Sequence, residues 1–168
     1  GRRAFIGSEA GEVRLWDAAT GDVIATYSVP ATPGVSVVRA VTDLAVLPDG
    51  ERIVVATGSG DVLLLTLDLQ RVVEIFRGGH TRSVTSVALN ASGSRLVTGS
   101  TDARAVIWDV STGASMQALT GHTSGLIAAV FDPRRTERAV TVARDGRMIA
   151  WNLTTGLPEA EFALPQTP

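Results

Sequence analysis

Short apolar segments alternate with polar turns along the whole chain. In the unit from residue 84 to residue 119, turn-forming residues separate the apolar segments at Asn90–Gly93, Thr101–Asp102 and Ser111–Gly113. This pattern is typical of β-strands joined by tight turns. It predicts four strands in this unit: Val84–Leu89, Arg95–Ser100, Arg104–Trp108 and Ser115–Leu119. The same order predicts four strands from Val41 to Phe76 and from Leu126 to Leu164, but only three in the first 28 residues.

Tryptophan marks a repeat. Trp108 and Trp151 are 43 residues apart, and these two and Trp16 are each followed by Asp or Asn. A large apolar residue follows each tryptophan after eleven positions, and Phe76 has Leu65 at the same distance before it. Leu65 therefore takes the tryptophan position of a degenerate unit. A fixed period of this length indicates a repeat architecture.

Two units carry a Gly-His pair ahead of the tryptophan. The pairs are Gly79-His80 before Trp108-Asp109 and Gly121-His122 before Trp151-Asn152. On these motifs the sequence resembles the WD-repeat family, whose units are four-stranded blades of a β-propeller. The resemblance implies an all-β fold of four-stranded antiparallel blades. About three and three-quarter blades are expected here, at residues 1–28 (partial), 35–77, 80–120 and 122–165. We expect them to belong to a larger ring, completed by the same polypeptide or by another chain.

These two units also share four polar or aromatic residues at matching offsets. The sets are His80, Thr98, Asp102 and Trp108, and His122, Thr141, Asp145 and Trp151. A carboxylate, an imidazole and a hydroxyl are the ingredients of nucleophilic catalysis. The resemblance implies instead a buried hydrogen-bond chain from the indole through the hydroxyl and His to the Asp. Because an active site is normally single, two copies favour a structural role, and no catalytic residue is expected.

The sequence lacks the motifs by which proteins usually bind a metal, a cofactor or a phosphate. Each histidine has only its own aspartate, and the chain has no Cys to complete a usual ligand set. The glycine-rich stretch Thr57–Asp61 lacks the Gly, Lys and helix that would follow in a phosphate-binding loop. We therefore expect a strand turn there, and neither a cofactor nor a metal in the chain.

Composition narrows the class of partner. The formal net charge of the 168 residues is -2, which provides no overall field for a nucleic-acid backbone or an anionic membrane. No apolar run approaches the roughly 18 residues of a membrane helix. All 15 basic residues are Arg, which codon bias explains better than nucleic-acid contact. Five of them gather in the last unit, and a solvated rim is favoured there over an RNA patch: Arg134, Arg135, Arg138, Arg144 and Arg147. The first three of these are expected in the turn opened by Asp132-Pro133.

The resemblance implies a non-catalytic scaffold for protein–protein interaction within a multisubunit complex. The absence of Cys suits a reducing compartment, and an intracellular location, cytoplasmic or nuclear, is expected. Partners of the family often meet the loops entering the first strands and the turns that carry the aspartate. Here those segments offer Arg82, Ser124, Thr101, Arg144 and Glu9 as candidate partner-binding residues. Two alternatives are an RNA- or ribonucleoprotein-associated subunit and a regulatory propeller attached to a catalytic domain outside this chain.

Overall fold

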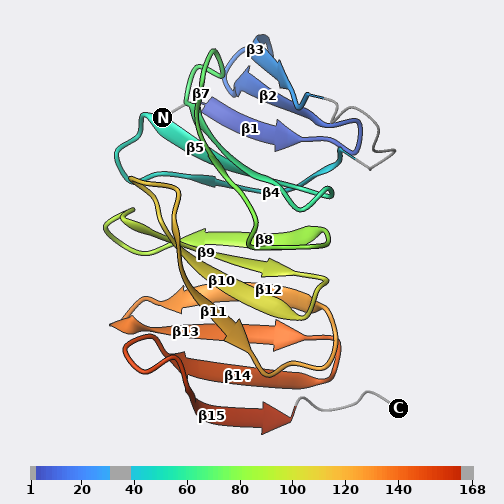
Figure 1. Ribbon diagram of the computed structural model, residues 1–168. Coiled ribbons are helices and arrows are strands. Elements are labelled where there is room, and N and C mark those ends of the chain that lie inside the picture. Colours follow the sequence, from blue (N-terminus) through green and yellow to red (C-terminus); the bar gives the residue numbers. More distant parts are fainter. Residues whose placement is uncertain (1–2, 31–38, 164–168) are drawn as a thin grey trace.

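Fifteen strands form four antiparallel sheets stacked one upon the next (Figure 1). The computed structural model describes residues 3–30 and 39–163, and within these ranges it contains no helix, and so none that could span a membrane. The expected boundaries at residues 1, 35 and 165, and the expected strand end at Leu164, lie outside the described residues. The predicted all-β fold of antiparallel blades is confirmed.

The first sheet has three strands and the other three sheets have four each, as the sequence predicts. The first sheet consists of β1 (Arg3–Gly7), β2 (Glu12–Asp17) and β3 (Val23–Ser28). The second consists of β4 (Val41–Val46), β5 (Arg52–Thr57), β6 (Val62–Thr66) and β7 (Val72–Phe76). The third consists of β8 (Val84–Leu89), β9 (Arg95–Ser100), β10 (Arg104–Asp109) and β11 (Ser115–Thr120). The fourth consists of β12 (Leu126–Asp132), β13 (Arg135–Ala143), β14 (Arg147–Asn152) and β15 (Pro158–Ala163).

Each sheet follows the chain order, so every strand pairs with the next one through a short turn. This is the up-and-down pattern of a propeller blade. The four blades are not closed into a ring, because the first and fourth sheets lie at opposite ends of the stack (Figure 1).

Three apolar cores lie between neighbouring sheets, where alternate side chains of two blades meet. Trp108 belongs to the core between the second and third sheets, where its ring lies edge-on to Phe76 with centroids 5.6 Å apart. Trp151 holds the same place between the third and fourth sheets. Trp108 and Trp151 therefore each pack between their own blade and the blade before it.

A polar contact also joins the innermost strands of neighbouring blades. Asp43 accepts a hydrogen bond from the Val87 backbone N–H at 2.8 Å, and Ser86 accepts one from the Ala129 N–H at 2.9 Å. The ladder shifts register next to both acceptors, so a β-bulge turns each side chain towards the following blade. These bonds fix the blades against one another.

Candidate functional site

The site is built on the two loops that carry the Gly-His pairs. His80 lies in the loop before β8, and its ring contacts Thr98 on β9 and Asp102 in the turn after β9. The Nδ1 atom lies 3.1 Å from Asp102 Oδ2, and Nε2 lies 2.6 Å from Thr98 Oγ1. The indole Nε1 of Trp108 donates to the same hydroxyl at 2.9 Å. The four residues therefore form one continuous chain of hydrogen bonds.

The direction of these bonds follows from which atoms carry protons. Because a carboxylate only accepts, His80 Nδ1 carries the proton and donates it to Asp102. In a neutral ring Nε2 then accepts from the Thr98 hydroxyl, which in turn accepts from Trp108. Burial is the largest influence on His80 and lowers its pKa, although the Asp102 carboxylate partly opposes the shift. The ring is thus neutral near pH 7.

The fourth sheet repeats the arrangement with its own set. His122 lies 2.8 Å from Thr141 Oγ1 through Nε2 and 3.0 Å from Asp145 Oδ2 through Nδ1. Trp151 Nε1 donates to the Thr141 hydroxyl at 2.8 Å. The structure thus brings together all the members of both predicted sets.

Each aspartate also fixes backbone. Asp102 accepts from the Thr81 N–H at 3.0 Å and from the Arg104 N–H at 3.0 Å, so it ties the loop to the turn. Burial alone would raise the pKa of Asp102, but these N–H bonds and the His80 ring outweigh it and lower the pKa. Asp145 follows the same logic through the Thr123 N–H and His122, and its pKa also lies well below the ordinary value. Both carboxylates are therefore ionised.

Steric contact with the indole explains why glycine precedes each histidine. A Cβ at Gly79 would overlap the Trp108 indole, and one at Gly121 would lie 3.0 Å from the Trp151 ring. The loop can therefore cross the indole only where it has no side chain. Hydrogen bonds fix the position of the histidine, and the space beside the indole restricts the preceding position to glycine.

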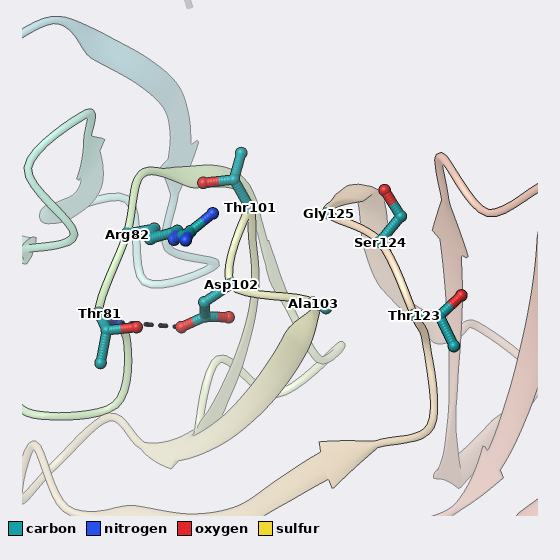
Figure 2. Close-up of a pocket in the computed structure, with 8 residues that line it drawn as sticks. All are labelled: Thr81, Arg82, Thr101, Asp102, Ala103, Thr123, Ser124 and Gly125. Carbon is teal, nitrogen blue, oxygen red and sulfur yellow. Dashed lines mark hydrogen bonds between the residues drawn. The ribbon is translucent and has the colours of Figure 1, made fainter.

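The two fixed loops border a polar cleft of about 460 Å³ between the third and fourth sheets. Figure 2 shows its walls: the loop of Arg82, the turn of Thr101, and the loop of Ser124. Three of the five candidate partner-binding residues thus meet in one place. Arg144 lies on the adjoining turn, where its N–H donates to the Gly125 carbonyl at 3.0 Å. Glu9 does not join them, since it lies in the turn between β1 and β2. The first sheet is at the far end of the stack from the fourth (Figure 1).

The first two sheets lack the network. Ser59 holds the Asp position of the second sheet and bonds within its own turn, to Thr57 at 2.8 Å and to Asp61 at 3.1 Å. In the first sheet, the buried Nε1 of Trp16 has no hydrogen-bond partner within the described residues. The residue at the threonine position there is Ile6, whose side chain cannot accept.

The arginines of the fourth sheet are placed differently from the prediction. Arg135 and Arg138 lie on β13 and not in the turn, because the strand begins directly after Arg134. Arg138 pairs with Asp132 at 3.4 Å and with Glu159 at 3.2 Å. Arg147 pairs with Asp145 at 3.2 Å and Glu161 at 3.1 Å. Two of the five arginines of the expected basic rim are thus paired with carboxylates of the same blade.

Sequence reasoning missed Asp43, Ser86 and Ala103. Asp43 and Ser86 are one repeat period apart, so a polar residue recurring within an apolar strand was an available signal. Ala103 has φ 68°, whereas the other three blades have glycine at this turn position, with φ between 75° and 94°. Alanine gives no sequence signal for a left-handed conformation.

Comparison with known protein families matches the part of the chain that carries one Gly-His pair and one Trp-Asp pair. Residues 70–109 match the model of the "WD domain, G-beta repeat" family, a match that begins near β7 of the second sheet and ends on β10. No curated protein matches the sequence.

Among solved structures, a chain in a crystal structure of the mitotic checkpoint complex is similar, with a TM-score of 0.83 and 19% identity. The similarity covers 97% of the present chain and 48% of the other, so this chain spans about half of its length. The sequence match carries the Gly-His and Trp-Asp motifs, and the fold repeats around them on both sides. Residues 70–109 therefore match a WD repeat, and the described chain has the fold of that similar structure.

Proposed function

We propose that the chain is a non-catalytic scaffold that binds protein partners within a multisubunit complex. The observation that supports this most is the burial of the His–Asp pairs. The side chains of His80 and Asp102 are 0% and 4% exposed, and both ring nitrogens are already bonded. The Thr98 hydroxyl is fully buried as well. A general base must reach a proton on its substrate, and this imidazole reaches only protein atoms.

The two hydrogen-bond networks determine which loops are held rigid at the surface of the third and fourth sheets. They hold two neighbouring loops in place, and those loops present Arg82, Thr101 and Ser124 at the cleft and Arg144 beside it. Binding residues are commonly placed on loops that a rigid scaffold positions. We propose that partners dock here, and that Glu9 extends the contact only for a partner large enough to reach the first sheet.

The outer face of the fourth sheet supports a place within a larger ring. Apolar residues face outwards in two rows across its strands: Val130, Val140, Ala150 and Ala160, and Ala128, Val142, Met148 and Phe162. Phe162 is 50% exposed, whereas Leu119 and Phe76 at the same repeat position are 2% and 1% exposed. In those two blades the next sheet covers the residue. We propose that a further blade, from the same polypeptide or from another chain, covers Phe162.

The docking proposal is tested with the complete polypeptide. Affinity capture with quantitative mass spectrometry compares the wild type with Arg82→Ala combined with Arg144→Ala. Arg71→Ala is the control, because Arg71 is exposed and lies at the opposite end of its blade. We expect the double variant to lose specific partners at an unchanged melting temperature. Recovery of the same partners by all three proteins would contradict this docking surface.

The alternatives receive less support. An RNA-associated subunit needs accessible arginines, and Arg138 and Arg147 are engaged in ion pairs. Strong salt dependence of binding would favour it nevertheless. A regulatory propeller beside a catalytic domain is distinguished by the sequence that flanks these residues in the complete polypeptide. An intracellular location is part of the proposal and is checked by imaging the tagged full-length protein.

A further inference from the structure

We infer that the cleft between the third and fourth sheets binds an oxyanion, either a phosphate monoester or a carboxylate, on an acidic segment of a protein partner. This inference rests on the proposed docking function and adds the chemistry of the partner. It is drawn from the charges, the hydroxyl groups and the backbone of the cleft.

The exposed charged side chain of the cleft is basic. Its lining includes one acidic and one basic side chain, Asp102 and Arg82. Asp102 is 4% exposed and its oxygens are already bonded to His80 and to two backbone N–H groups, so they are not presented to the cleft. Arg82 is exposed and makes no ion pair within residues 3–30 and 39–163. Its guanidinium extends towards the turn of Thr101 and Asp102 (Figure 2). A planar guanidinium is suited to bind a carboxylate or phosphate.

The hydroxyl groups around Arg82 are available as donors. Those of Thr81, Thr123 and Ser124 make no hydrogen bond in the part of the chain that the structure describes, and Thr101 makes only a long one, of 3.4 Å, to the Ser83 carbonyl. The corresponding turn of the second sheet differs, since the Ser59 hydroxyl there is bonded to Thr57 and Asp61. A cleft with one free cation and free hydroxyls favours an oxyanion over a cation or an apolar group.

The backbone of the cleft is unusual at Ala103. This residue lines the cleft and has φ 68°, in the left-handed region that disfavours any side chain. The matching residues of the other blades are Gly11, Gly60 and Gly146. Residues held in unfavourable backbone conformations concentrate at ligand sites. The methyl group of Ala103 is a feature of this cleft that the other three turns lack.

The test measures small oxyanions directly on the full-length protein. Backbone amide and arginine side-chain NMR shifts are followed during titration with inorganic phosphate, O-phosphoserine and N-acetylglutamate, at constant ionic strength set with chloride. We expect saturable shifts at Arg82, Thr101 and Ser124. Arg82→Gln is expected to weaken binding by roughly tenfold, the equivalent of one charge-assisted hydrogen bond. Arg71→Gln is the control, because Arg71 lies at the other end of a blade, and it is expected to leave the affinity for the oxyanion unchanged.

The outcomes separate the two oxyanions and the two proposals. Tighter binding of the phosphate compounds assigns a phosphorylated segment, and tighter binding of N-acetylglutamate assigns an acidic one. Absence of saturable shifts, or equal shifts in Arg82→Gln and Arg71→Gln, overturns the oxyanion site. Partners that still depend on Arg82 and Arg144 in the capture experiment would in that case leave the docking proposal standing.

Discussion

Trp108 and Thr98 share a hydrogen bond of 2.9 Å across adjacent strands, and the threonine hydroxyl passes the contact on to His80 at 2.6 Å. One buried hydroxyl therefore satisfies two buried nitrogens, one on a strand and one on a loop. Thr141 does the same for Trp151 and His122. The loops at the cleft depend on these two hydroxyls for their position.

Replacing Thr98 by Val keeps the shape but removes both bonds. We expect the free energy of unfolding to fall by about 1–3 kcal/mol for each of the two buried nitrogens that are left without a partner. Thr141→Val is expected to cost a similar amount. Thr26→Val, on the exposed strand β3, is the matched control and should change stability by less than about 0.5 kcal/mol. Equal stability of Thr98→Val and Thr26→Val by urea denaturation would show that the network does not stabilise the blade.

As the pH is lowered, the free energy of unfolding is expected to decrease in two stages. Burial lowers the pKa of His80, so below the ordinary histidine value of about 6.5 the unfolded chain binds a proton that the folded chain does not. Acidification below this value therefore favours unfolding. The pKa values of Asp102 and Asp145 are also lowered, so their contribution is present above the ordinary aspartate pKa and is lost as pH falls through the folded values.

The first stage is checked on the histidine itself. In an NMR titration, the His80 ring should take up its proton below pH 6.5, and the melting temperature should begin to fall over the same range. His80→Gln should weaken the fall in melting temperature that begins below pH 6.5, while the fall at lower pH, which comes from the aspartates, remains. A His80 midpoint above 6.5 would mean that the carboxylate outweighs burial, and the first stage would then be absent.

The indole Nε1 of Trp16 has no hydrogen-bond partner among residues 3–30 and 39–163, which suggests a stabilising substitution. Ile6 pairs with Arg14, two residues before Trp16, just as Thr98 pairs with Val106, two residues before Trp108. Ile6→Thr would therefore place a hydroxyl where the Trp16 Nε1 can donate. We expect a gain of about 0.5–1.5 kcal/mol, the net value of one hydrogen bond. Ile6→Val supplies no acceptor and is the control. A gain shared by both variants would point to strand propensity in place of the new bond.

The strands could be predicted from the sequence because each blade repeats the same alternation and ends its turns in the same residues. The residues of the two hydrogen-bond networks could be predicted from the family resemblance, because the motifs that carry it occur in two units. The cleft could not be predicted in the same way. Arg82 and Ser124 belong to different blades, and their approach depends on how two sheets pack, which no local pattern encodes.

Other features escaped the sequence for separate physical reasons. Arg138 was expected in a turn, but its pairing with Asp132 and Glu159 belongs to a longer strand β13. The bond from Ala129 to Ser86 needs a β-bulge, and the polar residues recurring at Asp43 and Ser86 mark these strands without showing that the backbone bulges there. Ala103 adopts a conformation that its residue type does not favour, so only the backbone reveals it.

Ala103 and Ala91 are expected to respond to glycine with opposite signs. At Ala103, glycine removes a left-handed penalty of about 1–2 kcal/mol and adds about 0.4–1 kcal/mol of unfolded-state entropy, so a small net gain in stability is expected. Ala91 lies in an exposed turn without a positive φ, so Ala91→Gly should lose about 0.4–1 kcal/mol. Thermal unfolding of the two variants checks the sign. Destabilisation by both would mean that contacts of the Ala103 methyl outweigh the backbone penalty.

The exposed face around Phe162 predicts how residues 1–168 behave when produced without any covering blade. Phe162, Val130 and Met148 lie on one apolar face that a neighbouring sheet would cover, and uncovered faces of this kind associate. We expect concentration-dependent self-association in analytical ultracentrifugation. Phe162→Glu should reduce it, since association would then bury a charge. Met116→Glu is the control, because Met116 is 52% exposed but lies on β11, away from this face. A monodisperse monomer that melts cooperatively would instead indicate that the fourth sheet needs no neighbour, which would remove the main support for a larger ring.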